Sequence, residues 1–372
     1  MRIAIDGTSL LGTRTGVGHV TAGLVEALDE RDDHDLDLTV FAVTWRGRSD
    51  LAGALPAGVE PATSRIPARL ARALWKRAAW PRAEAWTGPV DVVHATNFVA
   101  PPARAPVIVT IHDLTFARYP EMCTADVLTY PTLVRRALDR GATVHVVSDF
   151  VGREVREHFG LGDERVTRVY AGVRPMSGGD GSAGRALAKA DRYVLALGTI
   201  EPRKNLPALV RAFDRTAGDH TDLSLVVAGA DGWGRDAFTA ACDAARHGDR
   251  IQRLGYVGER DRRDLLAGAT VFAYPSHYEG FGHPPLEAMA ARIPVVASDA
   301  GALPETLGDA ALLVDPSDDD ALAEQLDRVL RDAELRDSLI TRGTERVGRF
   351  SWPRAAADFV DLYRRQLVRS EP

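Results

Sequence analysis

Two glutamates eight positions apart, Glu279 and Glu287, stand in the stretch YEGFGHPPLEAMA at residues 278–290. The stretch cannot be one helix, because glycine disfavours a helix interior and the double proline at 284–285 fits only a first turn. The pattern therefore predicts a strand at 271–276, a glycine loop carrying Glu279, and a helix carrying Glu287. Free backbone N–H groups at such a helix start favour an anion such as phosphate.

Two adjacent cations, Arg203 and Lys204, follow a predicted strand in the stretch GTIEPRKN at residues 198–205 and precede a helix that starts at Asn205. Cations at a helix N-terminus oppose the helix dipole and need a compensating anion. This position favours a clamp for a diphosphate over the alternative, a solvated surface pair.

A histidine and a glycine turn in the first half of the chain are weaker candidates. His112 closes a predicted strand at 107–113, where it could hydrogen-bond a sugar hydroxyl or stabilise positive charge, although a structural role is equally compatible. Gly16 and Gly18 precede a predicted helix and would let the backbone approach a phosphate, or would simply connect strand to helix. Thr-Trp-Arg at residues 44–46 supplies no acid after the second strand, which counts against a dehydrogenase.

Short apolar, β-branched runs alternate with helical patterns throughout the chain, which is typical of parallel sheets covered by helices. The sequence therefore predicts an α/β fold with two doubly wound sheets, whose ligands bind beyond the C-terminal ends of the strands. The predicted strands are 2–6, 38–43, 90–95, 107–113, 143–148 and 166–172 in the first sheet, and 193–198, 223–229, 251–257, 271–276, 294–301 and 310–315 in the second.

The length of 372 residues predicts two domains. We expect a first domain at 1–175, a linker at 176–192 because that segment is rich in Gly, Ser and Ala, and a second domain at 193–352. A final helix at 353–367 has an apolar stripe that could pack on either domain, and we assign residues 353–372 to the first domain.

Composition excludes several classes of protein. The net charge of −6 argues against a nucleic-acid binder. Cys123 and Cys242 match no metal spacing and indicate a reducing compartment, and Asp35 and Asp37 lack further ligand candidates, so we predict no metal site. The absence of a signal peptide or an 18-residue apolar run predicts a cytoplasmic protein.

Residues 65–86 carry six basic residues, one acidic residue and three tryptophans. On a helix, Arg69, Arg72 and Lys76 would share one face, a pattern suited to an anionic membrane surface. A core-packed helix with a solvated basic face is the favoured alternative. The segment leaves open a peripheral location at the inner face of a membrane.

The motifs EPRKN, GYV, YPSHYEGFGHPPLEAMA, PVVAS and LPE together resemble the retaining glycosyltransferases of family 4. The resemblance implies the GT-B fold, with two Rossmann-like domains facing across a cleft and a last helix that crosses back to the first. It extends over almost all of the second domain. In the first domain only the glycine turn and His112-Asp113 support it.

The resemblance also implies roles for individual residues in binding a nucleotide sugar. Arg203 and Lys204 would bind the diphosphate, Glu279 the hydroxyls of the transferred sugar, and Glu287 the ribose. The remaining contacts would come from His112 beside the reacting sugar, from Gly280, Phe281 and Gly282 around sugar and phosphate, and from the loop Gly16, Val17 and Gly18 on the diphosphate.

The implied chemistry is hexosyl transfer with retention, without metal or other cofactor, the leaving group being stabilised by cations and helix dipoles. The first domain would bind a hydroxyl acceptor, lipid-linked or glycan, and the second the donor. GDP-mannose is the first expected donor and a UDP-sugar the second, with cell-envelope polysaccharide or glycolipid as product. Two alternatives stay open: a sugar-nucleotide epimerase, and a catalytically silent sugar-binding or scaffold subunit.

Two residues depart from the family pattern. His283 stands where the family often has leucine after GFG, so it either tunes donor choice or caps the helix. Arg292 replaces a common glycine before PVVAS, a change expected to affect only the turn.

Overall fold

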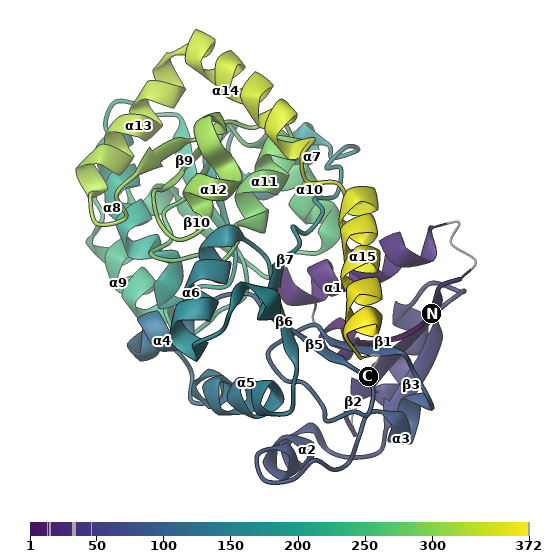
Figure 1. Ribbon diagram of the computed structural model, residues 1–372. Helices are drawn as coiled ribbons and strands as arrows, with labels where there is room; N and C mark the ends of the chain where they lie inside the picture. The colour runs from purple at the N-terminus through teal and green to yellow at the C-terminus, as the bar shows by residue number, and fades with distance from the viewer. Residues whose placement is uncertain (13, 15, 32–34, 46, 371–372) are drawn as a thin grey trace. The chain divides into compact units, whose positions relative to one another are not determined.

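The computed structural model describes residues 1–12, 14, 16–31, 35–45 and 47–370 (Figure 1). The chain divides into two compact units: unit 1 combines Met1–Gly172 with Phe350–Pro372, and unit 2 is Val173–Arg349. Arg46, used above to argue against a dehydrogenase, lies outside the described residues, as do Thr13 and Thr15 of the first glycine turn.

Unit 1 is built on a parallel sheet with the strand order β3-β2-β1-β4-β5-β6-β7 in the described residues. Alternate residues of the strands enter two separate apolar cores, so that Ile3 and Ile5 pack with α1 and α15 while Ala4 packs with α2 on the other face. The strands are β1 (Arg2–Asp6), β2 (Asp37–Val43), β3 (Glu60–Ser64), β4 (Val92–Ala95), β5 (Val107–Ile111), β6 (Thr143–Val146) and β7 (Val166–Arg168), and the α-helices are α1 (Gly16–Asp29), α2 (Ala68–Trp75), α3 (Glu84–Thr87), α4 (Thr115–Arg118), α5 (Tyr130–Asp139), α6 (Asp149–Phe159) and α15 (Trp352–Ser370).

Unit 2 is built on a second parallel sheet, with the order β10-β9-β8-β11-β12-β13. Its strands are β8 (Arg192–Leu197), β9 (Leu223–Ala228), β10 (Ile251–Gly255), β11 (Val271–Tyr274), β12 (Val295–Ser298) and β13 (Leu312–Val314), and its α-helices are α7 (Gly181–Ala188), α8 (Leu206–Thr216), α9 (Arg235–Ala244), α10 (Glu259–Gly268), α11 (His283–Ala290), α12 (Leu303–Leu307), α13 (Asp319–Arg331) and α14 (Ala333–Val347). In both units, all strand neighbours run parallel, as the sequence predicted.

The strand β3 was missed by the sequence analysis. Its sequence EPATS begins with Glu60 and Pro61, which are poor strand formers, and it lacks a run of β-branched residues. Proline is tolerated here because β3 is the edge strand and pairs only with β2 among the described strands.

The predicted linker at 176–192 was wrong. It contains the helix α7, which belongs to unit 2, packs on α10, and is capped by the side chain of Asp180. Its small residues serve this contact, since a Cβ atom on Gly184 would overlap the carbonyl oxygen of Asp264. A composition that suggests a loop therefore belongs to a closely packed helix.

The single helix considered for 65–86 was also wrong. The helix α2 ends at Trp75, and α3 begins at Glu84 after an interruption that includes Pro81. The indole N–H of the buried Trp75 donates to the carbonyl oxygen of Pro81 at 3.0 Å. Part of the tryptophan content of this segment therefore serves packing.

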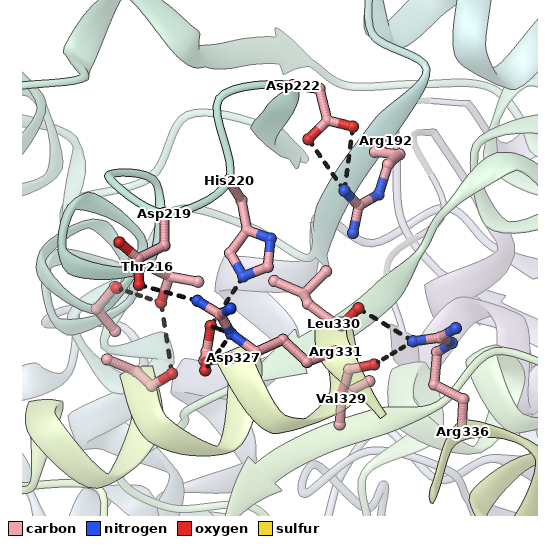
Figure 2. Close-up of polar contacts among 12 residues, drawn as sticks. Arg192, Thr216, Asp219, His220, Asp222, Asp327, Val329, Leu330, Arg331 and Arg336 are labelled. Atoms are coloured by element: carbon pink, nitrogen blue, oxygen red, sulfur yellow. Dashed lines mark hydrogen bonds and ion pairs between the residues drawn. The ribbon is translucent and has the colours of Figure 1, made fainter. Parts of the chain in front are cut away.

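Ion pairs lie at the N-terminal ends of the strands of the unit 2 sheet, opposite the C-terminal strand ends. Figure 2 shows Arg192, at the start of β8, in contact with both carboxylate oxygens of Asp222, at 3.0 Å each. On α13, Arg331 pairs with Asp219 at 2.9 Å and with Asp327 at 2.8 Å. The charged side chains at these strand ends thus pair with one another and connect α13 to the turn before β9.

The C-terminal helix α15 is joined to the sheet of unit 1 by a buried chain of hydrogen bonds. The Tyr363 hydroxyl lies 2.8 Å from His94 Nδ1, and His94 Nε2 lies 2.8 Å from Thr110 Oγ1. The chain continues from Thr110 Oγ1 to His145 Nδ1 at 2.9 Å and from His145 Nε2 to the Val169 carbonyl at 3.0 Å. Both imidazoles are neutral because burial lowers their pKa, and since the Val169 carbonyl can only accept, each step then has one consistent direction.

Burial lowers the pKa of His145 to about 3 and that of His94 well below its ordinary value. Between the lowered pKa and about 6.5, the unfolded chain binds protons that the folded chain does not, so stability falls as the pH is lowered below about 6.5. We predict that each of these histidines costs the protein about 2 kcal/mol of unfolding free energy between pH 7 and pH 5.

Urea unfolding at several pH values checks this prediction. His145→Gln removes one of the two titrations, so its stability should vary less steeply with pH than that of the wild-type chain, whatever its absolute stability. Equal slopes in the two proteins would contradict the assignment.

Candidate functional site

A cluster of buried charges lies beyond the C-terminal ends of β8 and β11 in unit 2. After β8, Arg203 and Lys204 occupy the 3-10 turn η7 (Pro202–Lys204), which leads directly into α8. After β11, the glycine loop carries Glu279 before α11 begins at His283. Because β8 and β11 are neighbours in a parallel sheet, both loops lie at the same end of the sheet, beyond the C-terminal ends of the strands.

Glu279 is the partner of both cations. Its Oε2 lies 2.6 Å from Arg203 Nη1, and its Oε1 lies 2.7 Å from Lys204 Nζ. Glu201 adds a second carboxylate, 2.7 Å from Arg203 Nη2. The compensating anion that the sequence required beside these cations is therefore present within the protein itself.

The electrostatics of the cluster keep Glu279 ionised. The residue is 6% exposed, and burial alone would raise its pKa, but the charges of Arg203 and Lys204 outweigh burial and lower the pKa to about 2. Burial lowers the pKa of Lys204, with Glu279 opposing that shift. A carboxylate with so low a pKa accepts hydrogen bonds but cannot exchange a proton efficiently near neutral pH.

Tyr274, the last residue of β11, was missed by the sequence analysis. Its hydroxyl lies 2.6 Å from Lys204 Nζ, which also lies 4.7 Å from the centroid of the tyrosine ring. Burial, followed by the charge of Glu279, raises the pKa of Tyr274 well above its ordinary value, so the phenol is neutral. Its place at a strand end that leads into the site was the only signal in the sequence.

Backbone contacts fix the loop that carries Glu279. The Glu279 carbonyl accepts from Ala302 N at 2.8 Å, and Arg203 Nη1 donates to the Tyr278 carbonyl at 2.9 Å. Gly301 has a φ of 61°, and a Cβ there would overlap the backbone of Glu279. The carboxylate is thus held from both its side chain and its main chain.

Glu287, the second glutamate of the motif, is held by a different cation. It lies on α11, is 8% exposed, and forms an ion pair with Arg262 of α10. Arg262 was missed because its segment ERDRRDLL holds several charges that sequence alone does not distinguish. The two glutamates of the motif therefore belong to separate charge clusters.

The residues at the start of α11 follow the predicted local structure. Gly282, with a φ of 95°, is the N-cap, and the two prolines occupy the first turn. Phe281 is buried, with its ring centroid 4.8 Å from that of His283, and Gly280 precedes it in the loop. Arg292, after α11, has a φ of 63°, which is the conformation that favours the glycine usual in the family.

The candidate residues of unit 1 are His112 and the glycine turn. His112 Nε2 lies 2.8 Å from the Thr96 carbonyl, so this nitrogen carries the proton and Nδ1 keeps a lone pair. Burial lowers the pKa of His112. An imidazole in this state can accept a hydrogen bond through Nδ1.

The helix α1 begins at Gly16, so the expectation that Gly16 and Gly18 precede the helix was wrong. Gly16, Val17 and Gly18 instead form its first turn. A Cβ on Gly18 would lie 2.5 Å from the Ser9 carbonyl oxygen, so this glycine permits close packing on the turn η1 (Thr8–Leu10). Among the described residues, no group of three or more His, Cys, Asp or Glu side chains could hold a metal ion.

Solved structures define the class of fold. The structure of sucrose-phosphate synthase from Thermosynechococcus elongatus covers 100% of both chains with a TM-score of 0.78 at 21% identity. The structure of HepE from Anabaena in complex with UDP and glucose covers 97% of this chain and 99% of its own, with a TM-score of 0.74 at 18% identity. These likenesses, with the two parallel sheets, identify a two-domain α/β protein of the GT-B class.

Sequence comparisons identify the family. Residues 14–176 match the model described as glycosyltransferase family 4, and residues 182–346 match the model described as glycosyl transferases group 1. O-antigen chain mannosyltransferase B of Escherichia coli is 31% identical over 76% of this chain and 77% of its own. The phosphatidyl-myo-inositol mannosyltransferase of Mycolicibacterium smegmatis is 29% identical over 74% and 71%.

The chain therefore belongs to glycosyltransferase family 4, as the motifs predicted, and is a glycosyltransferase. The relatives named above are transferases. Their names do not favour the two alternative hypotheses, a sugar-nucleotide epimerase and a catalytically silent subunit. No helix in the described part of the chain is long and apolar enough to cross a membrane.

We predict that Glu279→Gln lowers the free energy of unfolding by about 3 to 5 kcal/mol, because it leaves Arg203 and Lys204 buried without their shared carboxylate. Glu154 offers a matched control, since it is equally buried but pairs with Arg118, whose side chain is 49% exposed. Glu154→Gln should cost about 1 kcal/mol, because water can solvate Arg118. Urea unfolding measures both variants, and equal losses would contradict the prediction.

Proposed function

We propose that the chain is a retaining, metal-independent hexosyltransferase that moves a sugar from a nucleoside diphosphate to a hydroxyl acceptor. The observation that carries the proposal is the cluster of Arg203 and Lys204 on Glu279 at the C-terminal strand ends of unit 2. Strand ends of open α/β sheets are where ligands bind, and paired cations suit a diphosphate. Unit 2 is proposed to bind the donor and unit 1 the acceptor.

Each residue of the cluster has a proposed task. Arg203 and Lys204 bind the diphosphate and stabilise the charge that develops on it as the glycosidic bond breaks. Glu279, ionised because of its low pKa, accepts hydrogen bonds from hydroxyls of the transferred sugar. Glu287, held by Arg262, contacts the ribose.

The transfer step needs no protein base in this proposal. The bond between the anomeric carbon and the phosphate oxygen breaks, the acceptor oxygen bonds to the same face of that carbon, and the acceptor proton passes to the leaving phosphate. The ionised Glu279 is unsuited to proton transfer, which supports this route. His112, Gly16, Val17 and Gly18 of unit 1, and Gly280, Phe281 and Gly282 of unit 2, keep the binding roles that the family resemblance gives them, as proposals.

GDP-mannose is the proposed donor, and a UDP-sugar is the second candidate. The names of the mannosyltransferase relatives support a mannosyl donor, and the HepE structure with UDP supports a nucleotide-sugar site in this fold. The acceptor is proposed to belong to cell-envelope polysaccharide or glycolipid, since the relatives include an O-antigen and a phosphatidylinositol mannosyltransferase.

We predict that one nucleoside diphosphate raises the melting temperature without added metal and in the presence of a chelator. GDP, UDP, ADP and dTDP are to be compared, because a ligand at 100 times its dissociation constant adds about 2.7 kcal/mol of stability. Lys204→Gln should abolish the shift and the transfer, whereas Lys189→Gln, at an exposed lysine of the same unit, should keep both.

Retention is checked separately, by proton NMR of the new glycosidic bond: the product should have the anomeric configuration of the donor. A shift that requires a divalent metal, or a Lys204→Gln variant with normal transfer, would overturn the donor site. An inverted product would overturn the retaining mechanism alone.

Peripheral membrane contact through residues 65–86 is a further proposal. Leu70 and Trp80 are 52% and 66% exposed, which supports it, whereas Arg72 is held by Asp126 and is unavailable to lipid. We predict that Arg69→Gln with Trp80→Ala weakens sedimentation with anionic vesicles. Unchanged binding of this double variant, or no binding by the wild-type chain, would remove the proposal.

A further inference from the structure

A second pocket, separate from the charge cluster, opens in unit 1. It has a volume of about 240 Å³ and lies beyond the C-terminal ends of β1, β2 and β4. Its chemically informative lining residues are Asp6, Arg72, Trp75, Asn97, Asp126 and Tyr130. The pocket therefore combines two aromatic rings with a few polar groups, as small-molecule sites commonly do.

Asp6, the last residue of β1, has a carboxylate oxygen that the described residues leave open to a hydrogen-bond donor. The residue is only 9% exposed. Its Oδ1 accepts from Thr8 N at 2.8 Å and from Thr8 Oγ1 at 2.6 Å, and Oδ2 has no hydrogen bond to the described residues. Asp6 lines the pocket, so this oxygen can accept a hydrogen bond from a donor group of a ligand.

The one arginine of this lining is already neutralised. Arg72 Nη1 contacts Asp126 Oδ1 at 3.2 Å and Oδ2 at 3.0 Å. With Asp6, the lining residues named above carry two carboxylates and one paired cation. Burial raises the pKa of Asp6 to about 6, so it is mostly ionised at pH 7. A phosphate or carboxylate ligand would be repelled, and no unpaired cation of this set would attract it.

The other groups suit an uncharged ligand with hydroxyls. The Asn97 side-chain amide makes no hydrogen bond to the described residues and offers both a donor and acceptor. The Tyr130 ring stacks on Phe98 at 4.9 Å between centroids, which fixes it as a wall of the pocket. The Trp75 indole N–H is bonded to Pro81, so Trp75 contributes apolar ring surface rather than a polar contact.

We propose that this pocket binds an uncharged sugar of the acceptor, with Asp6 accepting a hydrogen bond from a sugar hydroxyl and Asn97 adding a second polar contact. The assignment to the acceptor rests on the proposed function, but the binding of a neutral glycoside does not. Asp6 is thus a specificity residue that selects a glycosyl end group over an anionic one.

Saturation-transfer NMR on the full chain tests the pocket with methyl α-glycosides of mannose, glucose, galactose and rhamnose as probes. At least one glycoside should bind, and inorganic phosphate at equal concentration should not displace it. Asp6→Asn and Asn97→Ala should each weaken binding about tenfold, the effect of one lost hydrogen bond to a charged or buried group.

Asp180→Asn is the matched control for Asp6. Asp180 Oδ1 accepts from Ser182 N at 2.8 Å and from Ser182 Oγ at 2.6 Å, the same turn, but at an exposed site in unit 2. This variant should bind the glycoside normally. GDP and UDP at equal concentration should not displace the glycoside, because a glycoside held in the proposed donor site would be displaced by a nucleoside diphosphate.

The outcomes separate this proposal from the donor site. Glycoside binding that depends on Asp6 supports the pocket, even if no nucleoside diphosphate binds and the proposed donor site fails. Four results overturn the pocket while leaving a nucleotide-dependent shift intact: no glycoside binding, displacement by phosphate, equal affinity in Asp6→Asn and the wild type, or displacement by GDP or UDP.

Discussion

The organisation of unit 2 depends on one interaction, the sharing of Glu279 by Arg203 and Lys204. Burying two cations beside each other is costly unless an anion lies within hydrogen-bond distance of both, and here the two separations are 2.6 and 2.7 Å. The rest of the loop geometry serves this contact. The turn η7 presents the cations, Tyr274 and Glu201 add polar partners, and Gly301 allows another backbone to pass close to Glu279. Such preorganised charge is what stabilises a leaving diphosphate in the proposed reaction.

In both units, polar side chains gather at the ends of the strands, but the two sets of side chains differ in chemistry. Each sheet is parallel and apolar on both faces, so polar side chains gather where the strands end. In unit 2 those ends hold Arg203 and Lys204 beside Glu279 and Glu201, and the two cations are proposed to bind a diphosphate. In unit 1 the unpaired oxygen of Asp6 and the neutralised Arg72 suit an uncharged, hydroxylated group. The side chains at the strand ends, rather than the sheet, thus distinguish a proposed donor site from a proposed acceptor site.

The sequence predicted what local patterns determine, and failed where tertiary contacts decide. Buried strands and the strand-loop-helix around Glu279 have clear patterns, so the fold class, the family and the position of α11 were predicted correctly. The edge strand β3 carries Pro61, which only its edge position permits. The sequence of α7 resembles a linker because it contains Gly184, which is a poor helix former. Glycine is needed there because the backbone of Asp264 packs closely against the helix. The pairing of Arg262 with Glu287 joins two helices, and no spacing within one segment predicts it.

The most direct test of the central claim is a crystal structure of the full chain with a nucleoside diphosphate sugar bound. We expect phosphate oxygens within hydrogen-bond distance of Arg203 and Lys204, and the Glu279 carboxylate within hydrogen-bond distance of hydroxyls of the sugar. A donor bound elsewhere, with Arg203 and Lys204 still paired to Glu279 and without contact to phosphate, would contradict this role.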